Sequence, residues 1–186
     1  MLRPALPIAT ERLLLRPLAP ADLDAVCDIY LRPQVTRYLY WKPRTRPDVA
    51  AWLAQRTDRG TLEREGDALS LALVLPGSGA FIGNVVLKWL SAAHQQGEVG
   101  FVLHPDHHRR GYAAEATRVM LRLGFEGLGL HRICGRCDGR NKASATVMER
   151  LGMRHEAHLR ENELVAGEWT DELIYAMLAT EWATRS

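Results

Sequence analysis

The stretch from Glu98 to Ala116 constrains the fold of this chain more than any other part of its sequence. Alternating apolar residues (Val99, Phe101 and Leu103) predict a strand, and a Pro-Asp turn follows it. Two arginines and a glycine then lead directly into a helical segment. Because the first N–H groups of a helix have no internal partner and carry partial positive charge, this strand–turn–helix segment predicts a binding site for an anion.

The residues of the turn favour a polyphosphate, most simply a pyrophosphate. Arg109 and Arg110 would add formal charge, and Gly111 would let the backbone approach a bulky ligand. The small Ala113 and Ala114 keep the first helical turn open. Two common phosphate loops are absent from the sequence, since there is no G-x-x-x-x-G-K-S/T and no G-x-G-x-x-G opens a helix after a strand. The pattern alone does not say which polyphosphate binds.

Length and composition set the class of protein. A chain of 186 residues predicts a single domain spanning residues 1–186, and 47% hydrophobic with 25% charged residues is ordinary for a globular protein. A net charge of +2 is too small to predict a nucleic acid or an anionic membrane as partner. The sequence has no apolar run long enough for a transmembrane helix, no apolar signal-peptide core, and only three cysteines. We therefore expect a cytoplasmic protein.

The order of predicted elements gives the fold class. Apolar periodicity and turn residues predict strands over residues 10–17, 68–75, 81–90, 98–103, 131–138, 153–160 and 168–178. The same signals predict helices over residues 19–31, 47–59, 110–128 and 141–151. This order predicts an α/β (α+β) protein in which a mixed, mostly antiparallel sheet is flanked by about four helices.

Several motifs resemble those of one family. The turn His108-Arg109-Arg110-Gly111-Tyr112-Ala113 is similar to the acetyl-coenzyme A loop of the GNAT (GCN5-related) N-acetyltransferases, whose pattern is Gln/Arg-x-x-Gly-x-Gly/Ala; only His108 departs from it. The element order is also that of the GNAT fold. Further motifs resemble the branch of the ribosomal-protein N-terminal acetyltransferases: Thr10-Glu-Arg-Leu-Leu-Leu-Arg-Pro-Leu, Arg37-Tyr-Leu, Leu128-Gly-Leu-His-Arg-Ile, Asn141-Lys-Ala-Ser, Leu151-Gly-Met and Gly167-Glu-Trp-Thr-Asp.

The resemblance implies a reaction and a co-substrate. Acetyl-CoA would donate its acetyl group to a primary amine, which is either a protein N-terminal α-amino group or a small molecule. The turn residues named above would bind the cofactor. Backbone N–H groups near Val102 and Leu103 would bind the acetyl carbonyl, where enzymes of this family separate the central strand from its neighbour. We expect direct attack in a ternary complex, since no cysteine stands where a covalent relay would need it.

Three residues are candidates for the chemistry. Glu98 resembles the strand glutamate that acts as the base in several members of the family; the alternative is a glutamate in solvent at the end of a strand. Ser144 would stabilise the leaving thiolate, and Asn141 would contact the pantetheine arm. The alternative is that Asn141 caps a helix and Ser144 is an ordinary first-turn residue. Met148 stands where many members carry a tyrosine acid.

Aromatic residues are candidates for the acceptor pocket. Tyr38, Tyr40 and Trp41 lie in the connection that shapes this pocket in the family, although aromatic residues are more often part of a core. No metal site is predicted, because a lone C-x-x-C (Cys134 and Cys137) on a regular strand directs its sulfurs to opposite faces.

Two other functions are compatible with the sequence. One is a transferase of the same fold that uses another acyl-CoA, such as succinyl-CoA. The other is a non-catalytic CoA-binding sensor, which the methionine in place of a tyrosine acid would fit. Pairing of an exposed edge strand with a second copy would give a homodimer, and the sequence does not decide its oligomeric state.

Overall fold

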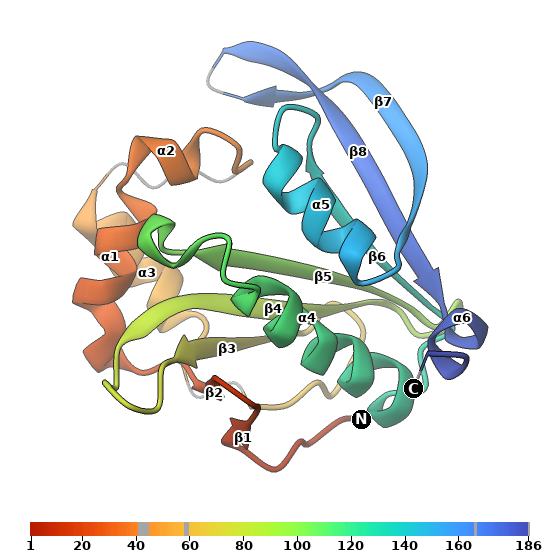
Figure 1. The fold of residues 1–186 in the computed structure, drawn as a ribbon, viewed down its shortest axis with the longest axis horizontal. Helices are drawn as coiled ribbons and strands as arrows, with labels where there is room; N and C mark the ends of the chain where they lie inside the picture. The colour runs from red at the N-terminus through yellow and green to blue at the C-terminus, as the bar shows by residue number, and fades with distance from the viewer. Residues whose placement is uncertain (41–44, 58–59, 166, 186) are drawn as a thin grey trace.

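A single mixed β-sheet organises the computed structural model, which describes residues 1–40, 45–57, 60–165 and 167–185 (Figure 1). The strand order is β1-β2-β3-β4-β5-β6-β8-β7. All neighbours are antiparallel except β5 and β6, which are parallel. The strands are β1 (Ile8–Ala9), β2 (Leu14–Pro17), β3 (Ala68–Val74), β4 (Phe81–Ser91), β5 (Gln96–Leu103), β6 (Arg132–Asp138), β7 (Arg154–Val165) and β8 (Glu168–Leu178).

Helices cover both faces of the sheet. They are α1 (Leu23–Tyr30), α2 (Pro33–Thr36), α3 (Arg46–Ala54), α4 (Tyr112–Arg122), α5 (Lys142–Arg150) and α6 (Ala179–Ala183). Helix α4 continues into a π-helical turn over Leu123–Gly127. Of the helices in the described ranges, none is both long and apolar enough to cross a membrane.

Strand β3 shows how the two hydrophobic cores form. Its residues are almost all apolar and buried, so it reads as a continuous apolar run rather than an alternating one. Leu71 and Leu73 belong to the core that includes residues of α4 and α5, whereas Ala72 and Val74 belong to the core that includes residues of α1 and α3. Because successive side chains of a strand point to opposite faces, these two helix layers lie on opposite sides of the sheet.

The predicted fold class is confirmed, with differences at element boundaries. The strand predicted over residues 10–17 is shorter in the structure and covers only Leu14–Pro17 (β2), because Thr10 and Leu13 close a turn between β1 and β2 through a backbone hydrogen bond of 2.8 Å. Helices α2 and α6 were not predicted, since four or five residues are too few to show a helical period. Strand β7 extends to Val165, beyond its predicted end, because this mostly exposed edge strand lacks an apolar pattern.

The sheet divides where β5 meets β6. The two strands pair only over three positions, of which Glu98 with Cys134 is the last. Beyond this pair β5 stays with β4 up to Leu103, while β6 stays with β8 up to Asp138. The facing edges of β5 and β6 therefore have no strand partner over their last residues. This divergence, which the resemblance implied, places unpaired main-chain groups beside the turn that leads to α4.

Candidate active site

The turn between β5 and α4 forms an open set of hydrogen-bond donors. A 3-10 turn over Pro105–His107 follows β5, and then Arg109 (φ 61°) and Gly111 (φ 84°) adopt left-handed backbone conformations. Gly111 is the N-cap of α4, and no side chain caps this helix. Among the described residues, none accepts a hydrogen bond from the backbone N–H groups of residues 109–114. These donors lie at the positive end of an eleven-residue helix, which makes the turn a suitable site for an anion.

The side chains of the turn take different positions. Arg109 and Arg110 are exposed, whereas Ala113 is buried in the core. His108, the residue that departs from the family pattern, places its Nε2 3.1 Å from the carbonyl oxygen of Leu103 and so closes the turn onto the end of β5. Tyr112 is half-buried and packs against the core.

The unpaired edge of β5 faces β6. A Cβ atom placed on Gly135 of β6 would lie 3.5 Å from the carbonyl oxygen of Val99, so the peptide groups of Val99 face β6. Alternate residues of a strand direct their N–H and C=O groups to the same edge, so Leu103 also faces the opening. Val102 is directed instead to β4, because its carbonyl oxygen is the atom nearest to the position that a Cβ on Gly83 of β4 would take. Of the two predicted donors, Leu103 is the one on the free edge.

Glu98 lies at the point of divergence and is held by two cations. Its side chain is 11% exposed, and its carboxylate accepts hydrogen bonds from Lys88 Nζ (2.6 Å) and Arg136 Nε (2.9 Å). The alternative of a solvent-exposed glutamate at a strand end therefore does not describe this residue. Each oxygen of a carboxylate can accept more than one hydrogen bond, so these two contacts leave Glu98 able to accept a proton directly or through a water molecule.

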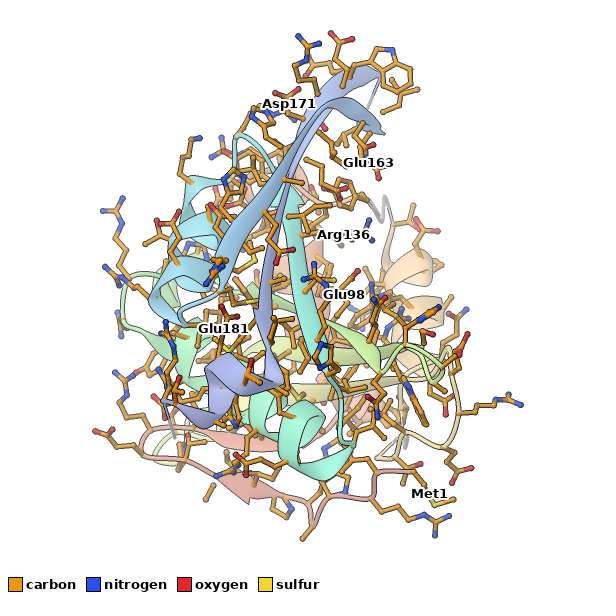
Figure 2. All side chains as sticks on the ribbon, turned by 90° about the vertical axis from the view of Figure 1, so that its right-hand side faces the viewer. Met1, Glu98, Arg136, Glu163, Asp171 and Glu181 are labelled. Carbon is orange, nitrogen blue, oxygen red and sulfur yellow. The ribbon has the colours of Figure 1, made fainter. Side chains whose placement is uncertain are left out.

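The ion pairs continue from Glu98 across β6 to β8. Arg136 also donates to the buried Glu172 (3.3 Å), which in addition accepts from Tyr40 Oη (2.9 Å) and Asn162 Nδ2 (3.1 Å). Figure 2 shows Glu98 and Arg136 close together near the centre of the sheet. Although partial burial opposes its charge, the carboxylates of Glu98 and Glu172 raise the pKa of Arg136. This network links the connection after α2 to β8, and no local pattern of residues predicts it.

The three aromatic candidates for the acceptor pocket differ in their surroundings. Burial, followed by the hydrogen bond to Glu172, raises the pKa of Tyr40, so its hydroxyl stays protonated. Tyr38 packs under the guanidinium of Arg37, whose Cζ atom lies 4.5 Å from the ring centroid. Trp41 lies outside the described residues. Tyr40 is thus the candidate that contacts the ion-pair network.

Asn141 and Ser144 begin helix α5. Asn141 Oδ1 accepts a hydrogen bond from the backbone N–H of Ser144 (3.1 Å) and so caps the helix. This is the role that the sequence analysis gives as the alternative to a contact with pantetheine. Met148 lies over the point where β5 and β6 separate, because its sulfur is 2.7 Å from the position that a Cβ on Gly135 would take. Residues four apart share a helix face, so Ser144 lies on this same face, one turn nearer the helix N-terminus.

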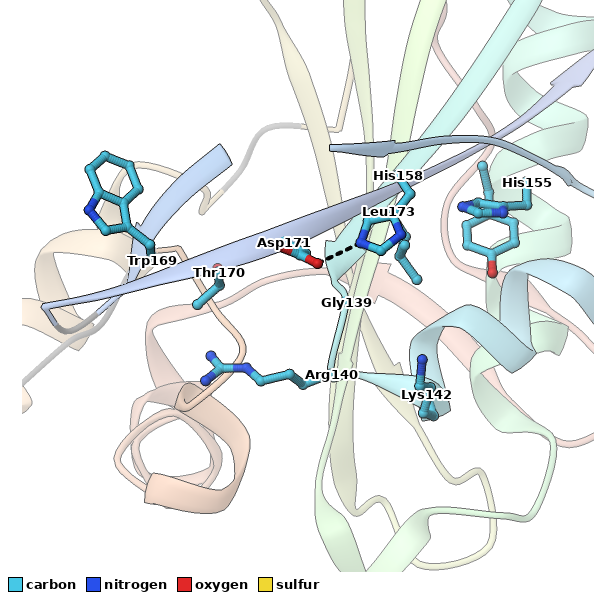
Figure 3. A pocket seen from close by; sticks show the side chains of 10 residues that line it. Gly139, Arg140, Lys142, His155, His158, Trp169, Thr170, Asp171 and Leu173 are labelled. Atoms are coloured by element: carbon cyan, nitrogen blue, oxygen red, sulfur yellow. Dashed lines mark hydrogen bonds and ion pairs between the residues drawn. The ribbon is translucent and has the colours of Figure 1, made fainter. Parts of the chain in front are cut away.

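A separate hollow of ≈ 610 Å³ lies beyond the start of α5, towards β7 and β8 (Figure 3). A polar contact in its lining joins His158 Nε2 and Asp171 Oδ2 at 2.6 Å. None of the predicted site residues lines it; the lining residues are Gly139, Arg140, Lys142, His155, His158, Trp169, Thr170, Asp171, Leu173 and Tyr175. Within the described ranges, no group of three or more His, Cys, Asp and Glu residues could hold a metal ion.

A sheet that divides beside an uncapped helix N-terminus is the arrangement that the resemblance to acyl-CoA-dependent transferases of the GNAT fold implied. The profile of the acetyltransferase (GNAT) domain matches residues 12–154. The uncharacterized N-acetyltransferase YnaD of Bacillus subtilis (strain 168) is 32% identical to this chain, and the match covers 94% of this chain and 98% of that protein. The chain belongs to the GNAT family, and its enzyme class is that of the N-acetyltransferases.

Two further comparisons agree. The crystal structure of an acetyltransferase (GNAT family) from Bacillus anthracis superimposes with a TM-score of 0.83 and 30% identity, covering 94% of this chain and 99% of that one. At lower identity, 23%, the chain is similar to the ribosomal protein uS5-alanine N-acetyltransferase of Escherichia coli (strain K12), over 96% of this chain and 94% of that protein. The resemblance to the branch of ribosomal-protein acetyltransferases is therefore supported at this lower level of identity.

Proposed function

We propose that this N-acetyltransferase binds acetyl-CoA and passes the acetyl group directly to a primary amine in a ternary complex. The observation that carries the proposal is the continuity of residues 98–114. Within this segment the free edge of β5 leads without a break into the uncapped N-terminus of α4. A thioester joined to a pyrophosphate needs two such sites in line, one for main-chain contacts to the acyl arm and one for the anion.

The cofactor would use both parts of this segment. The N–H groups of residues 109–114 would donate to the pyrophosphate, and Arg109 and Arg110 would add charge. The acyl arm would lie along β5, where the N–H of Leu103 faces the opening. A backbone donor at this place would stabilise the negative charge that develops on the acetyl oxygen during attack.

The reaction then requires one proton to leave the amine nitrogen and the negative charge of the leaving thiolate to be stabilised. The amine nitrogen attacks the acetyl carbon, the carbon–sulfur bond breaks, and the nitrogen loses one proton. We assign the acceptance of this proton to Glu98, directly or through a bridging water, because its carboxylate lies where β5 and β6 separate. Ser144 would donate a hydrogen bond to the leaving thiolate from the face of α5 that also carries Met148.

Direct transfer is favoured over a covalent relay by the environment of Cys134. This cysteine pairs in register with Glu98 and is half-buried. Burial and the neighbouring negative charge of Glu98 raise the pKa of its thiol, which keeps it protonated and makes it a poor nucleophile. Mass spectrometry after mixing the enzyme with acetyl-CoA alone tests this point, because a trapped acetyl-enzyme would contradict direct transfer.

The acceptor amine would enter from the face of the sheet that carries Glu98, Arg136 and Tyr40. Glu172 and the nearby Glu163 place carboxylates on this side, which would attract a protonated amine. The similarity to an enzyme that acetylates an alanine of ribosomal protein uS5 makes a protein N-terminus one candidate acceptor, and a small amine is the other.

One experiment tests the proposal as a whole. Calorimetric titration with acetyl-CoA should show binding, and a panel of N-terminal peptides and small amines should then show amine-dependent release of free thiol. Absence of acetyl-CoA binding would contradict the cofactor site. Binding without turnover on any amine would favour the sensor function, and faster turnover with succinyl-CoA than with acetyl-CoA would favour the other donor.

A further inference from the structure

The loop between β1 and β2 reaches across to the cofactor turn through Arg12. One of its guanidinium nitrogens donates to the carbonyl oxygen of Arg110 (2.8 Å), and its Cζ atom lies 5.1 Å from the ring centroid of Tyr112. Another nitrogen lies 3.2 Å from the position that a Cβ on Gly111 would take. One side chain from the other end of the sequence therefore touches three consecutive residues of the turn.

Arg12 is itself held in place by helix α4. Glu115, in the first turn of α4, accepts from Arg12 Nε (2.8 Å) through one oxygen. Its other oxygen accepts from the backbone N–H of Arg12 (2.9 Å) and from Thr10 Oγ1 (2.6 Å). The Glu115 side chain is only 14% exposed. Glu115 thus balances the charge of Arg12 and fixes its position. From this position the guanidinium donates its hydrogen bond to the Arg110 carbonyl.

The hydrogen bond to Arg110 sets the direction of the next N–H group. In a planar trans peptide the C=O of one residue and the N–H of the next point in opposite directions. With the Arg110 carbonyl directed to Arg12, the N–H of Gly111 points away from Arg12. The preceding residue, Arg109, has a positive φ that is unfavourable for a residue with a side chain, so this turn depends on outside contacts to keep its shape.

We propose that Arg12, fixed by Thr10 and Glu115, is a positioning residue that holds the turn 109–111 in the conformation that binds the pyrophosphate of the acyl donor. The inference rests on the proposed function of this turn. It also gives a role to Thr10 and Arg12 of the N-terminal motif.

The test compares two donors on the full-length enzyme. S-acetylpantetheine carries the same thioester as acetyl-CoA but lacks the pyrophosphate. For Arg12→Ala we expect the KM for acetyl-CoA to rise about tenfold, as for the loss of one charge-assisted hydrogen bond, with kcat changed less than about twofold. The kinetics with S-acetylpantetheine should not change. Arg12→Lys should resemble Arg12→Ala, because an ammonium lacks the fork that serves Glu115 and Arg110 together.

The control is Arg3→Ala, which removes an exposed arginine whose partner is Glu63, with both side chains more than half exposed. This variant should behave as the wild type with both donors. Equal losses with both donors in Arg12→Ala, or kinetics like those of the wild type, would overturn the role of Arg12. A wild-type enzyme that does not prefer acetyl-CoA to S-acetylpantetheine would instead overturn the pyrophosphate site itself, and the inference with it.

Discussion

At the scale of single residues, the most informative side chain is Glu98. A carboxylate that ends the parallel pairing of β5 with β6, and that bonds to Lys88 and Arg136, has two roles open to it. It accepts a proton during the reaction, or it fixes the angle at which the strands separate by holding Arg136. Conservative substitution tests the first role, because glutamine keeps the shape of the side chain and one acceptor oxygen but carries no charge and cannot take up a proton from the amine.

For Glu98→Gln we expect kcat to fall by about 10²- to 10⁴-fold, the usual contribution of a general base, with the KM for acetyl-CoA unchanged. Steady-state kinetics over a range of pH would measure this. Glu63→Gln is the matched control, because this glutamate pairs with Arg3 at the surface. If Glu98→Gln retains its kcat, Glu98 holds Arg136 and is not the base.

At the scale of elements, the N-terminus of α4 depends on one glycine. Gly111 has a φ of 84°, where a side chain is strained, and an added Cβ would also meet the guanidinium of Arg12. Gly66 offers a matched comparison, since its φ is 90° and an added Cβ there would meet no atom within 4 Å. The two positions share the backbone strain and differ in their surroundings.

We expect Gly111→Ala and Gly66→Ala to lower the free energy of unfolding by similar amounts, about 1 kcal/mol each, as the cost of a left-handed alanine. Only Gly111→Ala should also weaken acetyl-CoA binding, because only its turn carries the anion site. Urea unfolding and calorimetric titration would measure the two effects. A similar loss of binding in both variants would show that general destabilisation is responsible.

The first turn of α4 also gives a pH dependence. Although partial burial opposes its charge, hydrogen bonds from Thr10 and Arg12 lower the pKa of Glu115 below its usual value. A carboxyl with a lowered pKa in the folded state contributes stability above its unfolded pKa, and this contribution is lost as the pH falls through the folded pKa. Glu115→Gln should therefore unfold about 2–4 °C lower than the wild type near neutral pH, with the difference disappearing in acid. Thermal unfolding at a series of pH values would test this, and a difference that persists in acid would contradict it.

The extent to which these features could be predicted follows from the distance in sequence between their parts. The strand, turn and helix around Gly111 are local, so alternation and turn residues predicted them. The contacts Arg12–Glu115 and Tyr40–Glu172 join residues 103 and 132 positions apart. These contacts depend on the strand register and on the tertiary arrangement of the elements, and neither of these leaves a local pattern in the sequence. The same reason explains why the pairing of Glu98 with Arg136 was not predicted, although Glu98 was.

At the scale of the whole molecule, the sheet consists of two parts that share three paired positions. Strands β1 to β5 form one part, and β6, β8 and β7 form the other. A cofactor bound along the edge of β5 would lie between them. We expect acetyl-CoA to slow hydrogen exchange of the amides over residues 99–103 and 135–138 more than that of β3, which lies inside one part. Exchange followed by mass spectrometry would measure this, and equal protection of β3 would place the cofactor elsewhere.

The three-position pairing of β5 with β6 has a consequence for how the enzyme would behave between turnovers. Three paired positions hold the two parts of the sheet together less firmly than a full-length strand pairing would. A ligand bound between β5 and β6 would add contacts to both parts and so restrict their relative motion. The protein would be stiffest while its donor is bound and would loosen each time CoA departs. Product release would then also be the moment at which the acceptor face is free to admit the next amine.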